Sequence, residues 1–261
     1  MSGPGSRRML LQERRRPCPA AADRPAREAY CLHPVPPVDR VPEPAGEGGV
    51  VVAETGQGRY ENHVVIGDES QFSVLVLHGI LGSCQNWRFF CNKLRRLRPS
   101  LRFVLADLRN HGRSPHIDGD NGLFECAQDL YQLQHKFGAF DAIVGHSFGG
   151  KVALQCANGV FDDRLKEVWV LDSNPAKEGT ESRDFSEVAQ VISMLQKVKL
   201  PIANRRALVT TLMSMGASDS IAKWMTTNVI KGNGGYVWKF NLNAITNMIE
   251  DYDQLFVEML Q

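Results

Sequence analysis

Long hydrophobic runs are missing from this 261-residue sequence. No stretch approaches the roughly 18 consecutive apolar residues that a helix needs to cross a bilayer, so we predict no membrane span. Charge of one sign is missing too, because 30 basic residues face 29 acidic ones and leave a formal net charge of +1. The overall charge therefore gives no reason to expect nucleic acid or an anionic membrane as a partner.

Cysteine is sparse and its spacing does not suit a metal site. The six cysteines form no CxxC pair, and Cys126 and Cys156 lie in apolar patterns with helical spacing. Such cysteines are typical of buried, reduced thiols, so we predict neither a disulfide framework nor a metal centre.

The first 50 residues lack lysine and any apolar periodicity, yet they hold eight arginines and nine of the thirteen prolines. Such a composition cannot bury enough surface to offset the entropy of ordering, so we predict a disordered tail over residues 1–55. An arginine-rich N-terminus also resembles a transit peptide, which would direct the protein to a mitochondrion or plastid. Interruption by Glu13, Asp23 and Glu28 favours a plain tail on a cytoplasmic protein, and both interpretations stay open.

Strand-like and helix-like segments alternate over residues 56–178. Continuous runs of apolar and β-branched residues predict buried strands over 64–66, 73–77, 102–106, 139–144 and 166–171. Apolar residues repeating every three or four positions predict helices over 86–97, 124–137 and 149–158. In the first helix, the residues that share one apolar face are Trp87, Phe90, Leu94 and Leu97. This alternation predicts a doubly wound, mostly parallel α/β sheet.

Residues 179–261 have a different pattern, with predicted helices over 188–198, 204–213, 221–228 and 244–260 and one strand-like patch at 236–240. Helices inserted after a parallel strand are typical of a cap over an active site. We therefore predict a helical cap segment over 179–261.

The most specific motif is Gly145-His146-Ser147-Phe148-Gly149, directly after a buried strand and before an apolar helix. This context gives G-x-S-x-G its meaning as a sharp turn that exposes a nucleophilic serine. The turn leaves no room for side chains at Gly145 and Gly149, and it places the Ser147 hydroxyl at a helix N-terminus, where negative charge is favoured. We predict Ser147 as the nucleophile; the alternative is a glycine-rich turn with an incidental serine.

A second motif, His78-Gly79-Ile80-Leu81-Gly82, follows the strand over 73–77. Acyl transfer needs two backbone N–H groups aimed at the developing oxyanion. We predict that Phe148 supplies one donor and Ile80 the other, with Leu81 as a close alternative to Ile80.

A third motif runs from Asp107 to Ser114 after the strand over 102–106. Its glycine and polar residues favour a structural turn that braces the oxyanion loop. A direct catalytic role for His111 or Asp107 is the alternative.

Together, H-G-x-x-G, D-x-R-N-H-G-x-S and G-H-S-x-G-G resemble the α/β-hydrolase family, serine esterase and lipase branch. The sequence is similar in particular to abhydrolase domain-containing proteins and bacterial acyl esterases, from about Tyr60 to Gln261, and the segment 237–242 adds to the match. The resemblance implies hydrolysis of a small-molecule acyl ester or thioester without a metal or cofactor. His78, Gly79, Gly145, His146 and Gly149 would form the supporting turns.

The resemblance also implies an acid after the nucleophile. Asp172 closes the strand over 166–171 and matches the acid of bacterial relatives. In other members the acid lies in the segment that matches 241–243, where this chain has Asn243, which cannot carry the charge.

The family's general base is a histidine on a late loop, and none of the seven histidines follows Ser147. The two strands and the helix that normally follow the cap have no counterpart, so we predict a C-terminally truncated chain that is weak or inactive, with 166–171 as an open sheet edge. His78 and His116 are possible substitute bases, while His146 is expected to point away from Ser147. A non-catalytic isoform that binds a ligand or partner is the alternative function.

Overall fold

The computed structural model describes residues 62–69, 71–161, 164–173 and 183–252. The predicted N-terminal tail and residues 253–260 of the predicted helix over 244–260 lie outside these residues, so those two predictions stay open.

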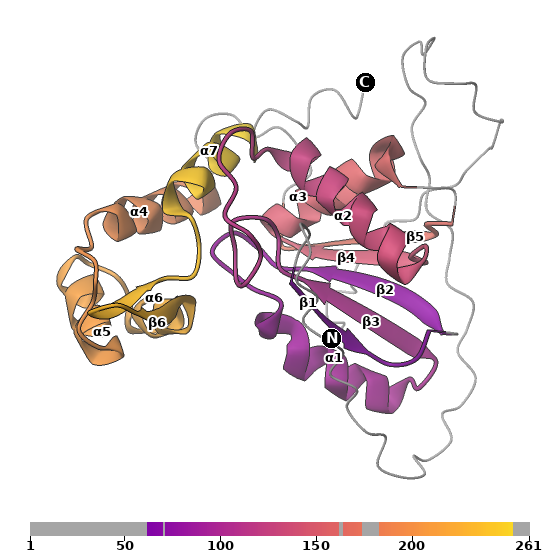
Figure 1. Ribbon diagram of the computed structural model, residues 1–261, viewed down its shortest axis with the longest axis horizontal. Helices are drawn as coiled ribbons and strands as arrows, with labels where there is room; N and C mark the ends of the chain where they lie inside the picture. Colours follow the sequence, from indigo (N-terminus) through magenta and orange to yellow (C-terminus); the bar gives the residue numbers. More distant parts are fainter. Residues whose placement is uncertain (1–61, 70, 162–163, 174–182, 253–261) are drawn as a thin grey trace, which may run out of the picture.

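A five-stranded sheet forms the centre of the fold, with strand order β1-β3-β2-β4-β5 (Figure 1). β1 runs antiparallel to β3, and the other three pairings are parallel, which confirms the predicted mostly parallel sheet. The strands are β1 (His63–Ile66), β2 (Phe72–Leu77), β3 (Leu101–Ala106), β4 (Ala142–His146) and β5 (Glu167–Leu171).

Helices cover both faces of this sheet. α1 (Gln85–Leu97) lies on one face, while α2 (Leu123–Phe137) and α3 (Phe148–Gln155) lie on the other, and α3 continues into the π-helical turn η1 (Cys156–Val160) (Figure 1). The residues of β2 alternate between the two cores, with Leu75 and Leu77 in one and Val74 and Val76 in the other. Burial on both faces explains the continuous apolar runs of the central strands.

The face that α1 turns to the sheet differs in part from the predicted one. Trp87 and Leu94 pack against the core as expected, but the third contact is the buried Cys91. Phe90 and Leu97 are 53% and 54% exposed. Residues three or four positions apart can share one face of a helix, so the sequence allows more than one apolar face for α1. In the structure, the face that contains Cys91, which is smaller than Phe90, packs against the sheet.

The cap contains four helices and a β-hairpin within residues 183–252, and its hairpin strand β6 was not predicted. The elements are α4 (Arg183–Gln196), α5 (Arg205–Ser214), α6 (Asp219–Met225), the 3₁₀ turn η2 (Thr226–Asn228), β6 (Val229–Gly232), β7 (Gly235–Trp238) and α7 (Leu242–Tyr252). They lie to one side of the sheet (orange and yellow in Figure 1), and α7 returns to the core. There the ammonium group of Lys151 in α3 donates to the carbonyl oxygen of Tyr252 at 2.7 Å.

β5 is an edge strand within the described residues, since its one pairing is with β4. Trp169 in the middle of β5 is 51% exposed and pairs in register with Val144. The predicted open edge is therefore present in the part of the chain that the structure describes.

Two smaller features complete the fold. The four described cysteines are buried thiols, as predicted, and burial raises the pKa of Cys91 to about 12. Among the described helices, none is long and apolar enough to cross a membrane.

Candidate active site

Ser147 lies at the turn between β4 and α3 in a conformation that a non-glycine residue rarely adopts, with φ 50° and ψ −120°. A β-carbon at Gly145 would collide with the carbonyl group of Gly149. One at Gly149 would lie 2.5 Å from the carbonyl oxygen of His78. Both glycines are therefore required for the turn, as the motif predicts.

Asp172 lies beside Ser147 at the carboxyl ends of two neighbouring parallel strands. The Ser147 N–H donates to the carbonyl oxygen of Leu171 at 2.9 Å, and Asp172 is the next residue. Its φ of 48° turns the chain away from β5, and its side chain is 88% exposed. In open α/β sheets this edge is where ligands bind.

His146 approaches Asp172 from the α1 side of the sheet. Its Nε2 lies 3.7 Å from Oδ2 of Asp172, and its ring meets the indole of Trp87 edge to face at 6.3 Å. Side chains alternate along a strand, so His146 shares the face of Val144, which packs against α1. The expectation that the His146 side chain points away from the Ser147 hydroxyl stays a prediction.

The predicted oxyanion loop packs directly against Ser147. A β-carbon at Gly79 would lie 3.2 Å from Cβ of Ser147. The loop forms a tight turn, in which the Gly82 N–H donates to the Gly79 carbonyl oxygen at 3.0 Å and Leu81 takes a φ of 59°. A positive φ at the third position is what a type II turn requires.

Hydrogen bonding within this loop distinguishes the two candidates for the second oxyanion donor, which are the N–H groups of Ile80 and Leu81. The Leu81 N–H already donates to Nε2 of His111 at 3.1 Å. In the described part of the chain, no hydrogen bond is donated by the N–H of Ile80, nor by that of Phe148, which is the first residue of α3 and has no intrahelical acceptor. The Leu81 alternative is thus disfavoured, and Ile80 with Phe148 stays the prediction.

His78 and His111 brace the two loops reciprocally. Nε2 of His78 accepts from the Leu108 N–H at 3.0 Å, just as His111 accepts from Leu81. Each Nδ1 then carries the proton and donates to a backbone carbonyl, that of Gly79 for His78 and that of Arg109 for His111. Both rings are neutral, because burial lowers the pKa of His78 and lowers that of His111 to about 3.

These bonds show what the two histidines do in the fold. All four ring nitrogens are engaged with backbone groups, which disfavours His78 as a substitute base and His111 as a catalytic residue. The predicted bracing of the oxyanion loop by the turn after β3 is a hydrogen bond from Leu81 to His111.

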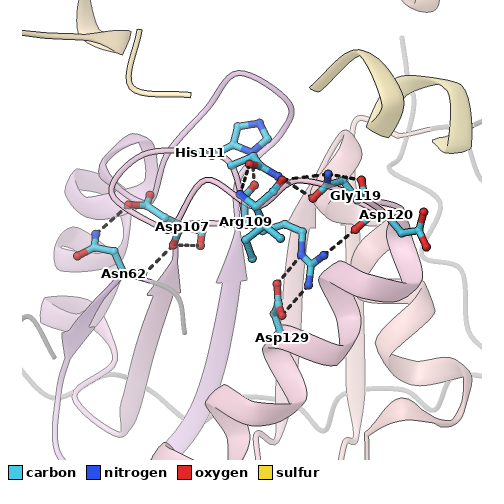
Figure 2. Close-up of polar contacts among 11 residues, drawn as sticks. Asn62, Asp107, Arg109, His111, Gly119, Asp120 and Asp129 are labelled. Atoms are coloured by element: carbon cyan, nitrogen blue, oxygen red, sulfur yellow. Dashed lines mark hydrogen bonds and ion pairs between the residues drawn. The ribbon is translucent and has the colours of Figure 1, made fainter. Parts of the chain in front are cut away.

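The Asp107 carboxylate extends this brace to the start of α1. It accepts from the Asn62 side-chain amide at 2.8 Å (Figure 2). It also accepts from the Cys84 N–H at 2.6 Å and from the Arg113 N–H at 3.0 Å. Both of its oxygens are thus engaged in structural contacts, so the interpretation as a supporting turn is favoured over direct catalysis for Asp107.

Arg109 ties the same turn to α2, a role that the sequence analysis missed. Its guanidinium group binds both carboxylate oxygens of Asp129, at 2.6 and 2.8 Å, and donates to the Asp120 carbonyl oxygen at 2.9 Å (Figure 2). The arginine is visible in the motif, but its partner lies 20 residues away without a motif of its own.

Within the described residues, three hydrogen bonds join the cap to these two loops. The Asn228 side chain donates to the Leu81 carbonyl oxygen at 2.7 Å, and the Asn241 N–H donates to the Asn110 carbonyl oxygen at 3.0 Å. His116, the other suggested substitute base, has Nε2 3.1 Å from the carbonyl oxygen of Lys239. Asn243 is exposed on α7.

Comparison with known families and proteins agrees with this architecture. Residues 73–191 match the family model described as alpha/beta hydrolase fold. The chain is 29% identical over 181 residues to the sn-1-specific diacylglycerol lipase ABHD11 of Xenopus tropicalis, covering 68% of this chain and 56% of that protein. It is 27% identical over 186 residues to ABHD11 of Mus musculus, covering 70% and 60%. The chain thus spans little more than half the length of these relatives.

A solved structure described as a marine microorganism esterase superposes with a TM-score of 0.67 at 28% identity, covering 74% of this chain and 73% of that one. The esterase YbfF of Escherichia coli is 23% identical over 195 residues, covering 74% and 68%. The sheet order, the strained serine turn and these similarities together show that the chain has the α/β-hydrolase fold and is similar to ABHD11.

Proposed function

We propose that this chain carries the site of a serine hydrolase that cleaves carboxylic esters or related acyl compounds through an acyl-enzyme on Ser147. The observation that carries the proposal is the strained Ser147, against which the Gly79 loop packs with the Ile80 and Phe148 N–H groups unused by the described residues. An arrangement of this kind costs backbone strain, which a purely structural turn has no reason to retain.

In the proposed reaction, Oγ of Ser147 attacks the carbonyl carbon of the substrate and its proton passes to a general base. The carbonyl oxygen becomes an oxyanion that accepts hydrogen bonds from Ile80 and Phe148. Collapse of this intermediate expels the protonated leaving group and leaves the acyl group on Ser147. Water then attacks the acyl-enzyme and releases the carboxylic acid, and Asp172 orients the base in both steps.

The base is the incomplete part of the site. No histidine follows Ser147 in the sequence, and the histidine beside Asp172 is His146, on the α1 face. In a well-studied serine protease, loss of the histidine lowers kcat by about 10⁶-fold. We therefore expect the chain to acylate slowly on its own.

A second candidate function follows from the same observation. A hydrolase-like chain without its base would bind an acyl ligand or a partner at the Ser147 edge without turning it over. The lack of a histidine after Ser147, with His146 on the α1 face as the histidine beside Asp172, favours this alternative.

A fluorophosphonate probe separates the two candidates, because it phosphonylates an activated serine and leaves a mass increment on it. We expect slow labelling of Ser147 and none in Ser147→Ala, together with slow release of acid from short-chain p-nitrophenyl esters. The name of the ABHD11 relatives makes the sn-1 ester of a diacylglycerol the next substrate to assay. A chain that binds a decanoyl phosphonate reversibly but is never labelled would support the non-catalytic alternative.

A further inference from the structure

Asn228 is a buried polar residue of the cap whose side chain reaches into the core. It ends the 3₁₀ turn η2, is 3% exposed, and its Nδ2 lies 2.7 Å from the carbonyl oxygen of Leu81, 147 positions earlier in the chain. We propose that Asn228 is a positioning residue through which the docked cap fixes the oxyanion loop. This inference rests on the proposed hydrolase function.

Leu81 is the residue of the loop that most needs restraint. A leucine in the left-handed region is strained, and the surrounding contacts must hold it there. The peptide on its N-terminal side is fixed by the core, through the bond from the Leu81 N–H to His111. The peptide on its C-terminal side is fixed by the cap, through Asn228. The orientation of Ile80, one residue earlier, therefore depends on both.

Asn228 is itself held firmly within the cap. Its backbone carbonyl accepts from the Lys239 N–H at 2.8 Å, and the ammonium group of Lys239 donates to the neighbouring Thr227 carbonyl at 2.6 Å. The next residue, Val229, is paired with Trp238 across the hairpin. The amide group of Asn228 is thus a fixed donor and moves with the hairpin as a unit.

Movement of the cap would leave the buried Leu81 carbonyl without this donor. An unpaired carbonyl in a buried position is unfavourable, so the strained turn would relax toward another conformation. The Ile80 N–H would then no longer point toward the position of the oxyanion. Formation of the oxyanion hole is in this way coupled to docking of the cap, and hence to whatever substrate the cap closes upon.

The cap offers a matched control for this idea. The contact between His116 and the Lys239 carbonyl also joins cap and core, but on the core side it touches only the turn after β3. Removing the His116 contact tests whether the loss of any contact between cap and core makes the oxyanion loop more mobile, or whether only the loss of the Asn228 hydrogen bond does so.

The experiment uses the full 261-residue chain. Asn228→Asp keeps the size and removes the donor, Asn228→Leu removes all polarity at similar volume, and His116→Ala is the control. Circular dichroism checks that each variant folds.

Amide hydrogen exchange followed by NMR is the primary measurement. We expect exchange at Leu81 and Gly82 to become roughly tenfold faster in the Asn228 variants, as for loss of one buried hydrogen bond, and to be unchanged in His116→Ala. Equal exchange rates in all three variants would overturn the proposal.

Phosphonylation of Ser147 gives the functional measurement. Because the loop acts in the transition state, we expect the limiting rate of labelling to fall at least about tenfold in the Asn228 variants while the probe concentration at half-maximal rate stays the same. A change in half-saturation alone would contradict a positioning role. Hydrogen exchange needs no catalysis, so failure of the wild-type chain to label would count against the proposed function and leave the exchange result to decide on Asn228.

Discussion

Two buried imidazoles, those of His78 and His111, connect the loops beside Ser147, and both act as hydrogen-bond acceptors through Nε2. A protonated ring could not accept the N–H of Leu108 at His78 or that of Leu81 at His111. The residues flanking the proposed oxyanion donor are therefore held by groups that must stay neutral, so proton binding and loop geometry are coupled.

This coupling predicts that the folded protein loses stability on mild acidification. Burial holds the pKa of His111 near 3, whereas in the unfolded chain it is about 6.5. The unfolded state thus binds more protons below pH 6.5, and the stabilisation present at neutral pH is lost progressively as the pH falls toward 3. We expect a loss of about 2 kcal/mol at pH 5 from His111, with a further loss of the same sign from His78.

Urea unfolding at pH 7 and pH 5 measures this loss. The variant His111→Gln, which can offer an oxygen acceptor to Leu81 without titrating, is the control and should show a smaller decrease. Equal pH dependence in the two proteins would show that other groups are responsible.

Arg109 and Asp129 form a buried ion pair that connects the turn after β3 to α2. Replacement of Asp129 by Asn removes the negative charge and leaves the guanidinium group in a largely buried site, with side-chain exposures of 11% and 15% for the pair. We expect a loss of about 3 kcal/mol in unfolding free energy, measured by urea titration.

The exposed pair between Lys223 and Asp219 provides the comparison. Lys223→Gln should change stability by less than about 0.5 kcal/mol, as is usual for surface pairs. A similar effect of both substitutions would mean that the Arg109 site is more hydrated than its geometry indicates.

At the scale of elements, the strands were predictable and one hairpin strand was not. The central strands are buried on both faces, so an unbroken apolar run marks each of them. β6 carries the exposed pair Ile230 and Lys231, and it follows directly on the helical turn that ends at Asn228. In a four-residue strand with two exposed residues, the hydrophobic pattern in the sequence cannot be distinguished from that of a helix end.

The candidate site was predictable for a related reason. The motif around Ser147 is local, and its glycines are required by collisions between residues a few positions apart. Asn228 and Asp129 act through contacts with distant residues, and neither carries a local signal. Sequence reasoning therefore locates the strained turn at Ser147 and misses the residues that hold the loops in place.

The edge strand β5 gives a prediction about association. Its backbone is unpaired on one side within the described residues, and Trp169 exposes an apolar surface beside it. Such an edge favours pairing with another chain. We expect concentration-dependent association, measured by light scattering, to decrease in Trp169→Lys.

Phe124→Lys is the matched control, because Phe124 is a similarly exposed aromatic residue on α2, away from the sheet edge. An equal decrease in both variants would point to general surface hydrophobicity, not to the edge of β5.

At the scale of the whole molecule, the predicted nucleophile, oxyanion loop and acid follow three neighbouring strands of one sheet, and the cap adds a fourth contribution. Ser147 and Asp172 come from neighbouring strands, the oxyanion loop from the strand on the other side of β4, and Asn228 from the cap. Ser147, the loop after β2 and Asp172 thus lie at one end of the sheet, and the general base is the predicted element to which no described residue is assigned. A small base supplied from solution can occupy that position if the edge beside Asp172 is open.

The Asp172 carboxylate is 88% exposed beside Ser147, which leaves it accessible to an added imidazole. We expect imidazole to raise the rate of p-nitrophenyl acetate hydrolysis by the wild-type chain above the rate with Ser147→Ala, which measures the reaction of imidazole with the ester in solution. Asp172→Asn should reduce this added rate, because an amide orients and stabilises an imidazolium poorly. An imidazole effect of the same size in wild type and Ser147→Ala would mean that the assembled donors and nucleophile do not act as a catalytic unit in this chain. A high rate without imidazole would mean that another group of the chain already serves as the base.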